Sequence, residues 1–195
     1  MTQRILILDG HPDPAAERFV HALAAAYQQG AEEGRHEVVA IRVADLEFPL
    51  LRTQADYERG DPVGAVRRCQ HAMDWATHVV ILYPLWLGTM PALLKGLLEQ
   101  SLRPGFAFSG RKLGRWPVKF FSGKSARIVI TMGMPALVYR WYFRAHSLRS
   151  LRRNILRFVG FRRVRATLIG SVAALSEPRR QAWLENMRAL GRAGR

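Results

Sequence analysis

The sequence predicts an α/β fold in which helices cover both faces of a five-stranded parallel sheet. Five short apolar runs are spread along the chain, and segments with apolar residues at helical spacing lie between most of them. Glycine or proline stands at many of the boundaries. Because parallel neighbours in a sheet need a long crossover connection, this alternation of strands and helices indicates a parallel sheet.

The predicted elements follow one another in a regular order. Each strand is predicted from a short apolar run, and each helix from apolar residues that recur every three or four positions. Along the chain we predict a strand at 4–9, a helix at 16–34, a strand at 36–43, a helix at 61–76, a strand at 78–83, a helix at 90–102, a strand at 126–132, a helix within 137–160, a strand at 164–172 and a helix at 178–191.

Residue preferences at the helix ends support two of these helices. Gly30 and Gly34 suit the end of the helix at 16–34. Asp61 is expected to cap the helix at 61–76, with Pro62 in its first position. Five strands joined in this way favour the flavodoxin-like, doubly wound order 2-1-3-4-5. The length of 195 residues predicts one domain spanning residues 1–195.

Composition excludes several classes of protein. Cys69 is the only cysteine, so the sequence predicts neither a disulfide framework nor a cysteine-based zinc site, and the six histidines show no paired metal spacing. Asp9 comes too early for the apolar core of a signal peptide, and no window holds 18 uncharged apolar residues. We therefore expect a cytoplasmic protein that is at most attached to a membrane surface.

The net charge of +15 is concentrated in one segment. Between Glu99 and Glu177 there is no acidic residue, whereas that stretch carries 16 lysines and arginines. The remainder of the chain holds 14 basic and 15 acidic residues. Such a field favours phosphates, nucleic acid or anionic lipid as partners.

Three unusual loops follow the first, third and fourth predicted strands. They read GHPDPAAERF, YPLWLGTMP and TMGMPALVY. In a parallel sheet the carboxyl ends of the strands meet at one edge, which is where ligands bind in doubly wound folds. The three loops are therefore expected to form one site.

Each loop brings its own chemistry to this site. The first leads into a helix N-terminus, which suits a phosphate, and His11 and Arg18 add donors. The second offers Trp86 as an aromatic wall, and in the third Gly133 lets the backbone approach a flat ring. Taken singly, the loops also permit a rigid turn, a core tryptophan and an ordinary strand-to-helix connection. Together they indicate a flavin mononucleotide or the flavin half of a dinucleotide.

The quoted segments carry a family resemblance. LILDGHPDP, YPLWLGTMPALLKGLLEQSLRPGFAF, TMGMPALVY and FVGFRRVRATLIGSV resemble, in order and spacing, the flavodoxin-fold NAD(P)H:quinone oxidoreductases, which include DT-diaphorase-like enzymes, drug-modulator quinone reductases and ancillary subunits of potassium efflux systems. The resemblance implies a flavin cofactor, FMN or FAD, with NAD(P)H as electron donor and a quinone-like acceptor. It also implies a homodimer.

The resemblance also implies a set of site residues. The implied cofactor-binding residues are His11, Arg18, Phe19, Pro84, Leu85, Trp86, Leu87, Thr131, Met132, Gly133, Met134 and Tyr139, and the implied catalytic residues are Tyr139 and His146. The chain departs from the family pattern in two places. His146 lies one residue further from Tyr139 than the family histidine does, and Ala15, Ala16 and Glu17 stand where the family has a phosphate-binding hydroxyl.

The predicted function is transfer of a hydride from NAD(P)H through the flavin to a quinone or similar acceptor. A flavin-binding regulatory subunit of a membrane transporter is the alternative. A nucleic-acid-binding protein is the least favoured reading, because none of the usual DNA or RNA motifs is present.

The basic segment offers one more prediction. Apolar residues from Trp141 to Phe158 recur at steps of three or four, which predicts one stripe of a helix, and the arginines lie mostly off that stripe. These arginines are either simply solvated, or they bring residues 137–165 to an anionic membrane surface or an acidic protein partner.

Overall fold

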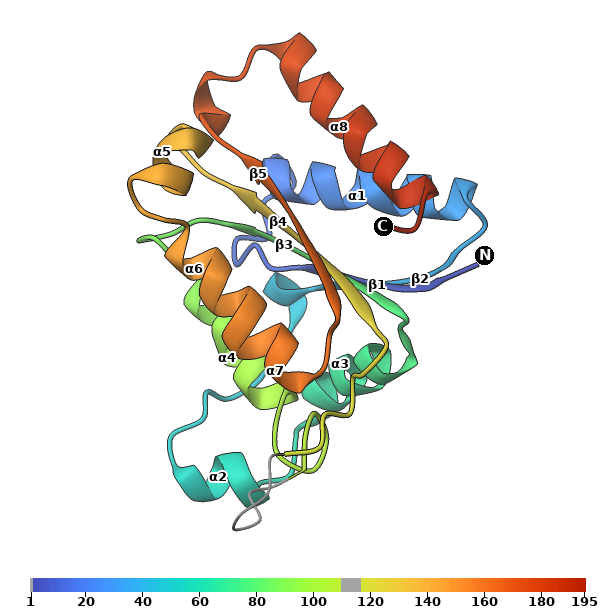
Figure 1. Cartoon of the computed structure of the whole chain (residues 1–195), viewed down its shortest axis with the longest axis vertical. Coiled ribbons are helices and arrows are strands. Elements are labelled where there is room, and N and C mark those ends of the chain that lie inside the picture. Colours follow the sequence, from blue (N-terminus) through green and yellow to red (C-terminus); the bar gives the residue numbers. More distant parts are fainter. Residues whose placement is uncertain (1, 110–116) are drawn as a thin grey trace.

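The structure, a computed structural model, describes residues 2–109 and 117–195 (Figure 1). Its sheet consists of β1 (Arg4–Asp9), β2 (Glu37–Arg42), β3 (His78–Pro84), β4 (Ser125–Thr131) and β5 (Arg163–Ile169). All neighbouring strands are parallel, and their order is β2-β1-β3-β4-β5. The predicted fold class and strand order are thus confirmed. The chain winds in opposite directions on the two sides of the β1–β3 junction, which is the switch point of this topology.

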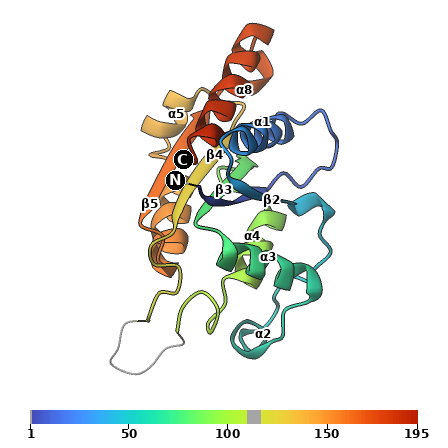
Figure 2. The ribbon, with the colours of Figure 1, turned by 90° about the vertical axis from the view of Figure 1, so that its right-hand side faces the viewer.

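Helices cover both faces of the sheet. On one face lie α1 (Phe19–Glu33) and α8 (Glu177–Arg192), which are neighbours on the same side of the sheet in Figure 2. On the other lie α3 (Gly64–Trp75), α4 (Ala92–Ser101) and a continuous segment of α6 (His146–Arg149), a π-helical stretch (Ser150–Leu156) and α7 (Arg157–Val159). The shorter elements are α2 (Gln54–Arg59), α5 (Ala136–Trp141) and two 3₁₀ turns at Val43–Asp45 and Val172–Ala174.

The alternation of side chains along each strand divides the core in two. Leu6 and Leu8 of β1 pack with α3 and α4, whereas Ile5 and Ile7 pack with α1 and α8. All four side chains are at most 1% exposed. Strands buried on both faces read as unbroken apolar runs, which is why the sequence alone located them.

Close packing of α1 against α8 depends on glycine. A Cβ on Gly30 would lie 1.9 Å from the carbonyl oxygen of Arg188, and one on Gly191 would lie 2.0 Å from that of Tyr27. Of the two glycines predicted to suit the end of the first helix, Gly34 caps it, whereas Gly30 lies inside it, because the helix continues to Glu33. Gly30 is needed for the helix contact instead.

Two further predictions about helices are corrected by the structure. Asp61 and Pro62 do not start α3, which begins at Gly64; the Asp61 carboxylate and the Pro62 carbonyl both bind the side chain of Arg67. The helix predicted within 137–160 is interrupted, since Arg144 and Ala145 adopt positive φ angles of 51° and 47°. The predicted apolar stripe therefore lies on one continuous helical segment only from His146 onward.

The described part of the chain contains no helix with both the length and the apolar character needed to cross a bilayer.

Candidate functional site

Three loops leave the sheet at its carboxyl edge and converge there, as the sequence predicts. The backbone N–H of Gly10, just after β1, donates to the carbonyl oxygen of Leu82 in β3 at 2.7 Å. The N–H of Leu85, just after β3, donates to that of Thr131 at the end of β4, also at 2.7 Å. These bonds fix the starting points of all three loops relative to one another.

Asp9 and His21 hold the first loop in place. One oxygen of the Asp9 carboxylate accepts from the backbone N–H of His11 at 3.1 Å, and the other pairs with Nδ1 of His21. Nε2 of His21 lies 2.9 Å from the carbonyl oxygen of Asp13. Sequence reasoning missed this pair, because an acid at a strand end and a histidine inside a helix are individually common. Only the fold shows that they meet.

His11 presents a hydrogen-bond donor to the site. Its Nδ1 accepts from the backbone N–H of Asp13 at 3.1 Å, so Nδ1 carries no proton. Burial, followed by the nearby His21, lowers the pKa of His11 below its usual value of 6.5. The ring is therefore a neutral imidazole whose proton is on Nε2. Its edge meets the ring of Trp86, with centroids 5.9 Å apart.

The second loop is a tight turn with an aromatic side chain at its start. Trp86 and Thr89 exchange two backbone hydrogen bonds of 2.9 Å, and Leu87 and Gly88 between them have φ angles of 45° and 79°. Two positive φ angles define a type I′ turn, which is unusual for leucine. Leu87 is fully exposed and Trp86 is 48% exposed. The strained turn thus holds Trp86 at the surface of the site.

The third loop is joined to the loop after β5. The N–H of Met132 donates to the carbonyl oxygen of Ile169 at 2.9 Å, and the N–H of Val172 donates to that of Met132 at 3.1 Å. Between these anchors, Gly133 is exposed, and a Cβ added there would meet no atom of residues 2–109 or 117–195 within 4 Å. The backbone at Gly133 therefore faces open space.

A cavity of about 460 Å³ lies where these loops meet. Its volume falls in the usual range for cofactor sites. The predicted site residues that line it are His11, Arg18, Phe19, Pro84, Leu85, Trp86, Thr131, Met132 and Gly133, and its other lining residues are Glu17, Val20, Val172, Ala173 and Arg180.

Four predicted site residues do not line this cavity. Leu87 points to solvent, and Met134 is partly buried against the core. Tyr139 is 2% exposed, and its hydroxyl lies 2.7 Å from that of Ser147 and accepts from the N–H of Leu148. His146 is exposed at the start of α6.

Arg180 is the most informative residue that sequence reasoning missed. It lies on α8, far along the chain from the other loops, and its guanidinium lies 5.1 Å over the ring of Phe19. Its Nη2 also donates to the carbonyl oxygen of Val172 at 3.0 Å. No sequence signal ties the first turn of α8 to the first loop, since the connection exists only in the folded chain.

Two charged side chains of the first loop, Arg18 and Asp13, form an ion pair with each other. Both Nε and Nη2 of Arg18 contact the Asp13 carboxylate, at 2.7 and 2.6 Å. A hydrogen bond from the N–H of Ala15, followed by the bond from Arg18, lowers the pKa of Asp13. Arg18 is exposed and no side chain caps α1. This end of the cavity therefore offers a guanidinium beside an open helix N-terminus.

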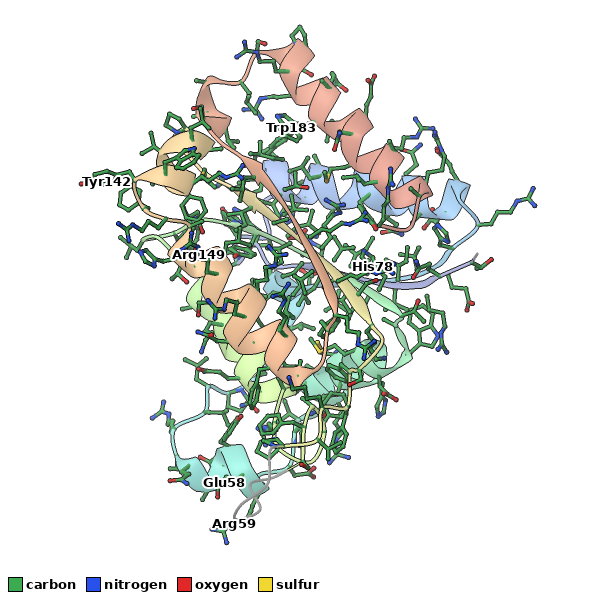
Figure 3. All side chains as sticks on the ribbon, viewed as in Figure 1. Glu58, Arg59, His78, Tyr142, Arg149 and Trp183 are labelled. Carbon is green, nitrogen blue, oxygen red and sulfur yellow. The ribbon has the colours of Figure 1, made fainter. Side chains whose placement is uncertain are left out.

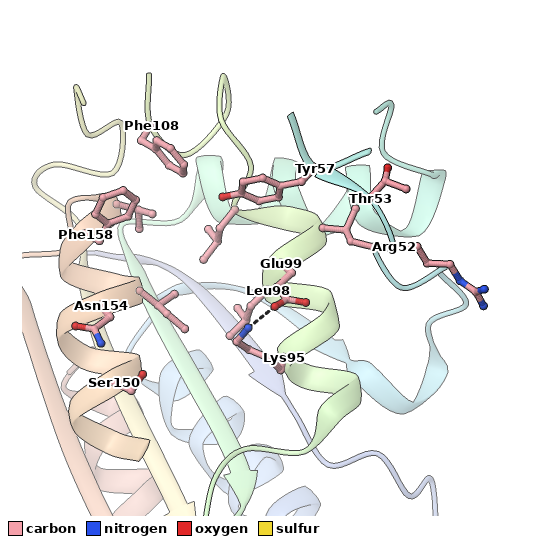
Figure 4. Close-up of a pocket in the computed structure, with 14 residues that line it drawn as sticks. Arg52, Thr53, Tyr57, Lys95, Leu98, Glu99, Phe108, Ser150, Asn154 and Phe158 are labelled. Atoms are coloured by element: carbon pink, nitrogen blue, oxygen red, sulfur yellow. Dashed lines mark hydrogen bonds and ion pairs between the residues drawn. The ribbon is translucent and has the colours of Figure 1, made fainter. Parts of the chain in front are cut away.

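A second cavity, of about 620 Å³, lies between α4, the loop after it and the π-helical segment (Figure 4). Apolar side chains, including Leu98, Ile155 and Phe158, form much of its wall. Its Lys95 and Glu99 pair with each other. Although it is the larger cavity, it lies away from the switch point and none of the predicted site residues line it.

Comparison with known proteins is consistent with this topology. A family described as having a flavodoxin-like fold matches residues 3–190. An uncharacterized NAD(P)H oxidoreductase of Haemophilus influenzae is 24% identical over 187 residues, covering 92% of this chain and 90% of that protein. A ribosyldihydronicotinamide dehydrogenase-like protein of Penicillium crustosum is 28% identical over 67% of this chain, which spans only 57% of the fungal protein.

Solved structures share the fold at low identity. The NAD(P)H:quinone oxidoreductase of Methanothermobacter marburgensis aligns with a TM-score of 0.79 and 21% identity, covering both chains completely. An FMN-dependent NADH-azoreductase of Bacillus anthracis, solved in complex with FMN, aligns with a TM-score of 0.72 and 15% identity over 100% of this chain and 97% of its own.

Proposed function

Since this chain belongs to the family with a flavodoxin-like fold, we propose that it is a flavin-dependent NAD(P)H oxidoreductase. In this proposal the cofactor is FMN, or FAD, and the electron acceptor is a quinone or a similar small molecule. The observation that carries the proposal is the convergence of three separate loops on one 460 Å³ cavity at the switch point of the sheet. The names of the bacterial and archaeal relatives support the same class of reaction.

The residues of the cavity suit the two ends of a flavin mononucleotide. Trp86 supplies an aromatic wall and the backbone at Gly133 is open to a flat ring. At the other end, Arg18 and the N-terminus of α1 suit a phosphate, and Arg180 adds a second guanidinium.

The end of the cavity that would hold the phosphate attracts an anion less well than the corresponding loop of the family that the sequence resembles. Ala15, Ala16 and Glu17 supply no hydroxyl, and the Glu17 carboxylate lines the cavity. A carboxylate would repel a phosphate, and Asp13 already competes for Arg18. We therefore expect Arg180 to provide much of the attraction for the phosphate.

When bound, a flavin would take a hydride from NAD(P)H and pass two electrons to the acceptor. The protein would orient the reacting rings and exclude water between them. His11 would donate a hydrogen bond through Nε2. Tyr139, whose hydroxyl is held by Ser147 and Leu148, would position the third loop. His146, at the exposed start of α6, would help to stabilise the reduced flavin.

Exposed aromatic side chains directly after the third loop support the proposed partners. Trp141 and Tyr142 are 74% and 79% exposed, and Tyr142 projects away from the molecule in Figure 3. Such a patch suits a second copy of the chain, as in the proposed homodimer. The arginines of residues 137–165, with no acidic residue among them, suit an anionic membrane surface or an acidic protein.

Purified protein tests the proposal directly. We expect a yellow protein that releases one flavin per chain, or that quenches the fluorescence of added FMN or FAD. Turnover of NADH or NADPH with a quinone or an azo dye then identifies donor and acceptor. A colourless protein that leaves both flavins fluorescent would refute the proposal. Flavin binding without turnover would favour the regulatory subunit instead.

A further inference from the structure

A small basic cavity lies at the opposite edge of the sheet from the candidate flavin site. Its volume is about 220 Å³. Its lining residues are Gln3, His78, Ser125, Ala126, Arg163, Arg165, Ala193, Gly194 and Arg195. The lining thus contains three arginines and no aspartate or glutamate. An anion is the ligand that such a cavity would attract.

The register of the sheet places these residues together. His78 begins β3, Ser125 begins β4 and Arg163 begins β5, and the three are aligned across neighbouring strands. Two residues further along, Arg127 of β4 is aligned with Arg165 of β5. Because residues i and i+2 of a strand share a face, both rows face the same side of the sheet. Three strands therefore bring together His78, Arg127, Arg163 and Arg165, which form one basic cluster.

The arginines of the cluster differ in how they are partnered. Arg127 is 6% exposed and already has two partners: it donates to the hydroxyl of Thr167 at 2.8 Å and to the backbone carboxylate oxygen of Arg195 at 2.9 Å. Within residues 2–109 and 117–195, no ion pair is formed by Arg163 or Arg165. Like charges gathered on one sheet face destabilise the fold unless an anion joins them.

His78 lines the cavity and carries a buried ring nitrogen without a hydrogen-bond partner in the described part of the chain. It is the first residue of β3 and is 3% exposed (labelled in Figure 3). Its Nδ1 is 2.7 Å from the hydroxyl of Ser125, whereas its Nε2 has no hydrogen-bond partner in the described part of the chain. If the serine hydroxyl donates to Nδ1, Nε2 carries the proton and is a free donor. Buried donors without a partner are rare, and an anion oxygen would satisfy this one.

We propose that this cavity binds a phosphate group, either as inorganic phosphate or at the end of a small phosphate ester. Arg163 and Arg165 would provide the charge, since guanidinium groups match phosphate oxygens geometrically. Nε2 of His78 would donate to one phosphate oxygen. A flat polyanion such as a bilayer would not reach His78, because that side chain is almost fully buried. The proposal is independent of the flavin site, which lies at the other edge of the sheet.

Titration of the full chain with inorganic phosphate, followed by calorimetry and by the NMR signals of the histidine rings, tests this site. We expect saturable binding that shifts the Nε2 signal of His78. Arg163→Gln and Arg165→Gln, each at an exposed position of the edge strand, should each weaken binding about tenfold. A parallel titration with glucose 6-phosphate separates the two sources: tighter binding than that of the free ion identifies a phosphate ester as the ligand, and weaker binding identifies inorganic phosphate.

Two control variants make the result decisive. Arg162→Gln removes the same charge one residue away, outside the cavity lining, and should leave binding unchanged. Arg180→Gln alters the flavin cavity, where phosphate could also enter, and should leave the His78 shift unchanged. Absence of any shift at His78, equal losses in Arg162→Gln and Arg163→Gln, or loss only in Arg180→Gln would overturn the proposal.

Discussion

Replacement of Gly133 with valine should weaken flavin binding while leaving the fold intact. A Cβ at this position meets no atom of the described residues within 4 Å, so the valine side chain has room among them. Gly133 has no positive φ angle, so valine introduces no backbone strain of that kind. We therefore expect the free energy of unfolding to change by no more than about 0.5 kcal/mol, as for most surface substitutions.

The effect on binding follows from where that open space lies. Gly133 lines the 460 Å³ cavity, so the added methyl groups occupy volume that the flavin ring would need. Overfilling a fitted site costs about 1–3 kcal/mol, which corresponds to a loss of affinity of roughly 5–150-fold. Titration of FMN, followed by quenching of its fluorescence, measures this loss.

Gly64→Val is the matched control. A Cβ at Gly64 likewise meets nothing within 4 Å in the part of the chain that the structure describes, and this residue lies at the start of α3, outside the lining of the cavity. Thermal unfolding of both variants shows whether they fold. If Gly133→Val bound FMN as tightly as the unchanged protein and the control, the third loop would not contact the flavin, and our placement of the cofactor would be wrong.

Other predictions test the remaining parts of the proposal. Arg180→Gln should weaken FMN binding about tenfold but riboflavin binding much less, because riboflavin lacks the phosphate. Calorimetry with both ligands measures this, with Arg179→Gln at a neighbouring exposed position as the control. Equal losses of affinity for FMN and riboflavin would contradict the prediction. His78 should make the fold less stable in acid, because burial, followed by the nearby Arg127, Arg165 and His36, lowers its pKa from 6.5 to about 4. Between these two pKa values the unfolded chain takes up a proton at His78 that the folded chain does not. The resulting loss of stability is absent above pH 6.5 and grows to about 3 kcal/mol of unfolding free energy as the pH drops toward 4. Urea unfolding of the unchanged protein and of His78→Gln, in buffers without phosphate, measures this difference, and parallel pH profiles would argue against it. Light scattering should give about twice the monomer mass of 22.1 kDa; a monomer at micromolar concentration would refute the homodimer. Co-sedimentation with phosphatidylserine vesicles should be stronger at low salt than at 1 M salt, where the Debye length is only about 3 Å, and equal partitioning with neutral vesicles would leave the arginines merely solvated.

The fold class and the loops that make the candidate site could be predicted from the amino-acid sequence without coordinates. Apolar runs such as residues 4–9 and 78–83 are legible because parallel strands are buried on both faces. Once the strands are parallel, their carboxyl ends must share an edge, so His11, Trp86 and Gly133 could be brought together without coordinates. Local chemistry and one topological rule were sufficient for this part.

The side chains that complete and support the site could be identified only in the folded chain. Arg180 stacks over Phe19 because α8 packs along α1, a contact between opposite ends of the chain that leaves no local pattern. The break at Arg144 was equally hidden, since helical spacing of apolar residues continues across it while the backbone turns. The basic cavity at the other edge likewise depends on strand register, which aligns His78, Ser125 and Arg163 across three strands. Spacing along a chain records local periodicity, whereas such contacts depend on how distant segments pack.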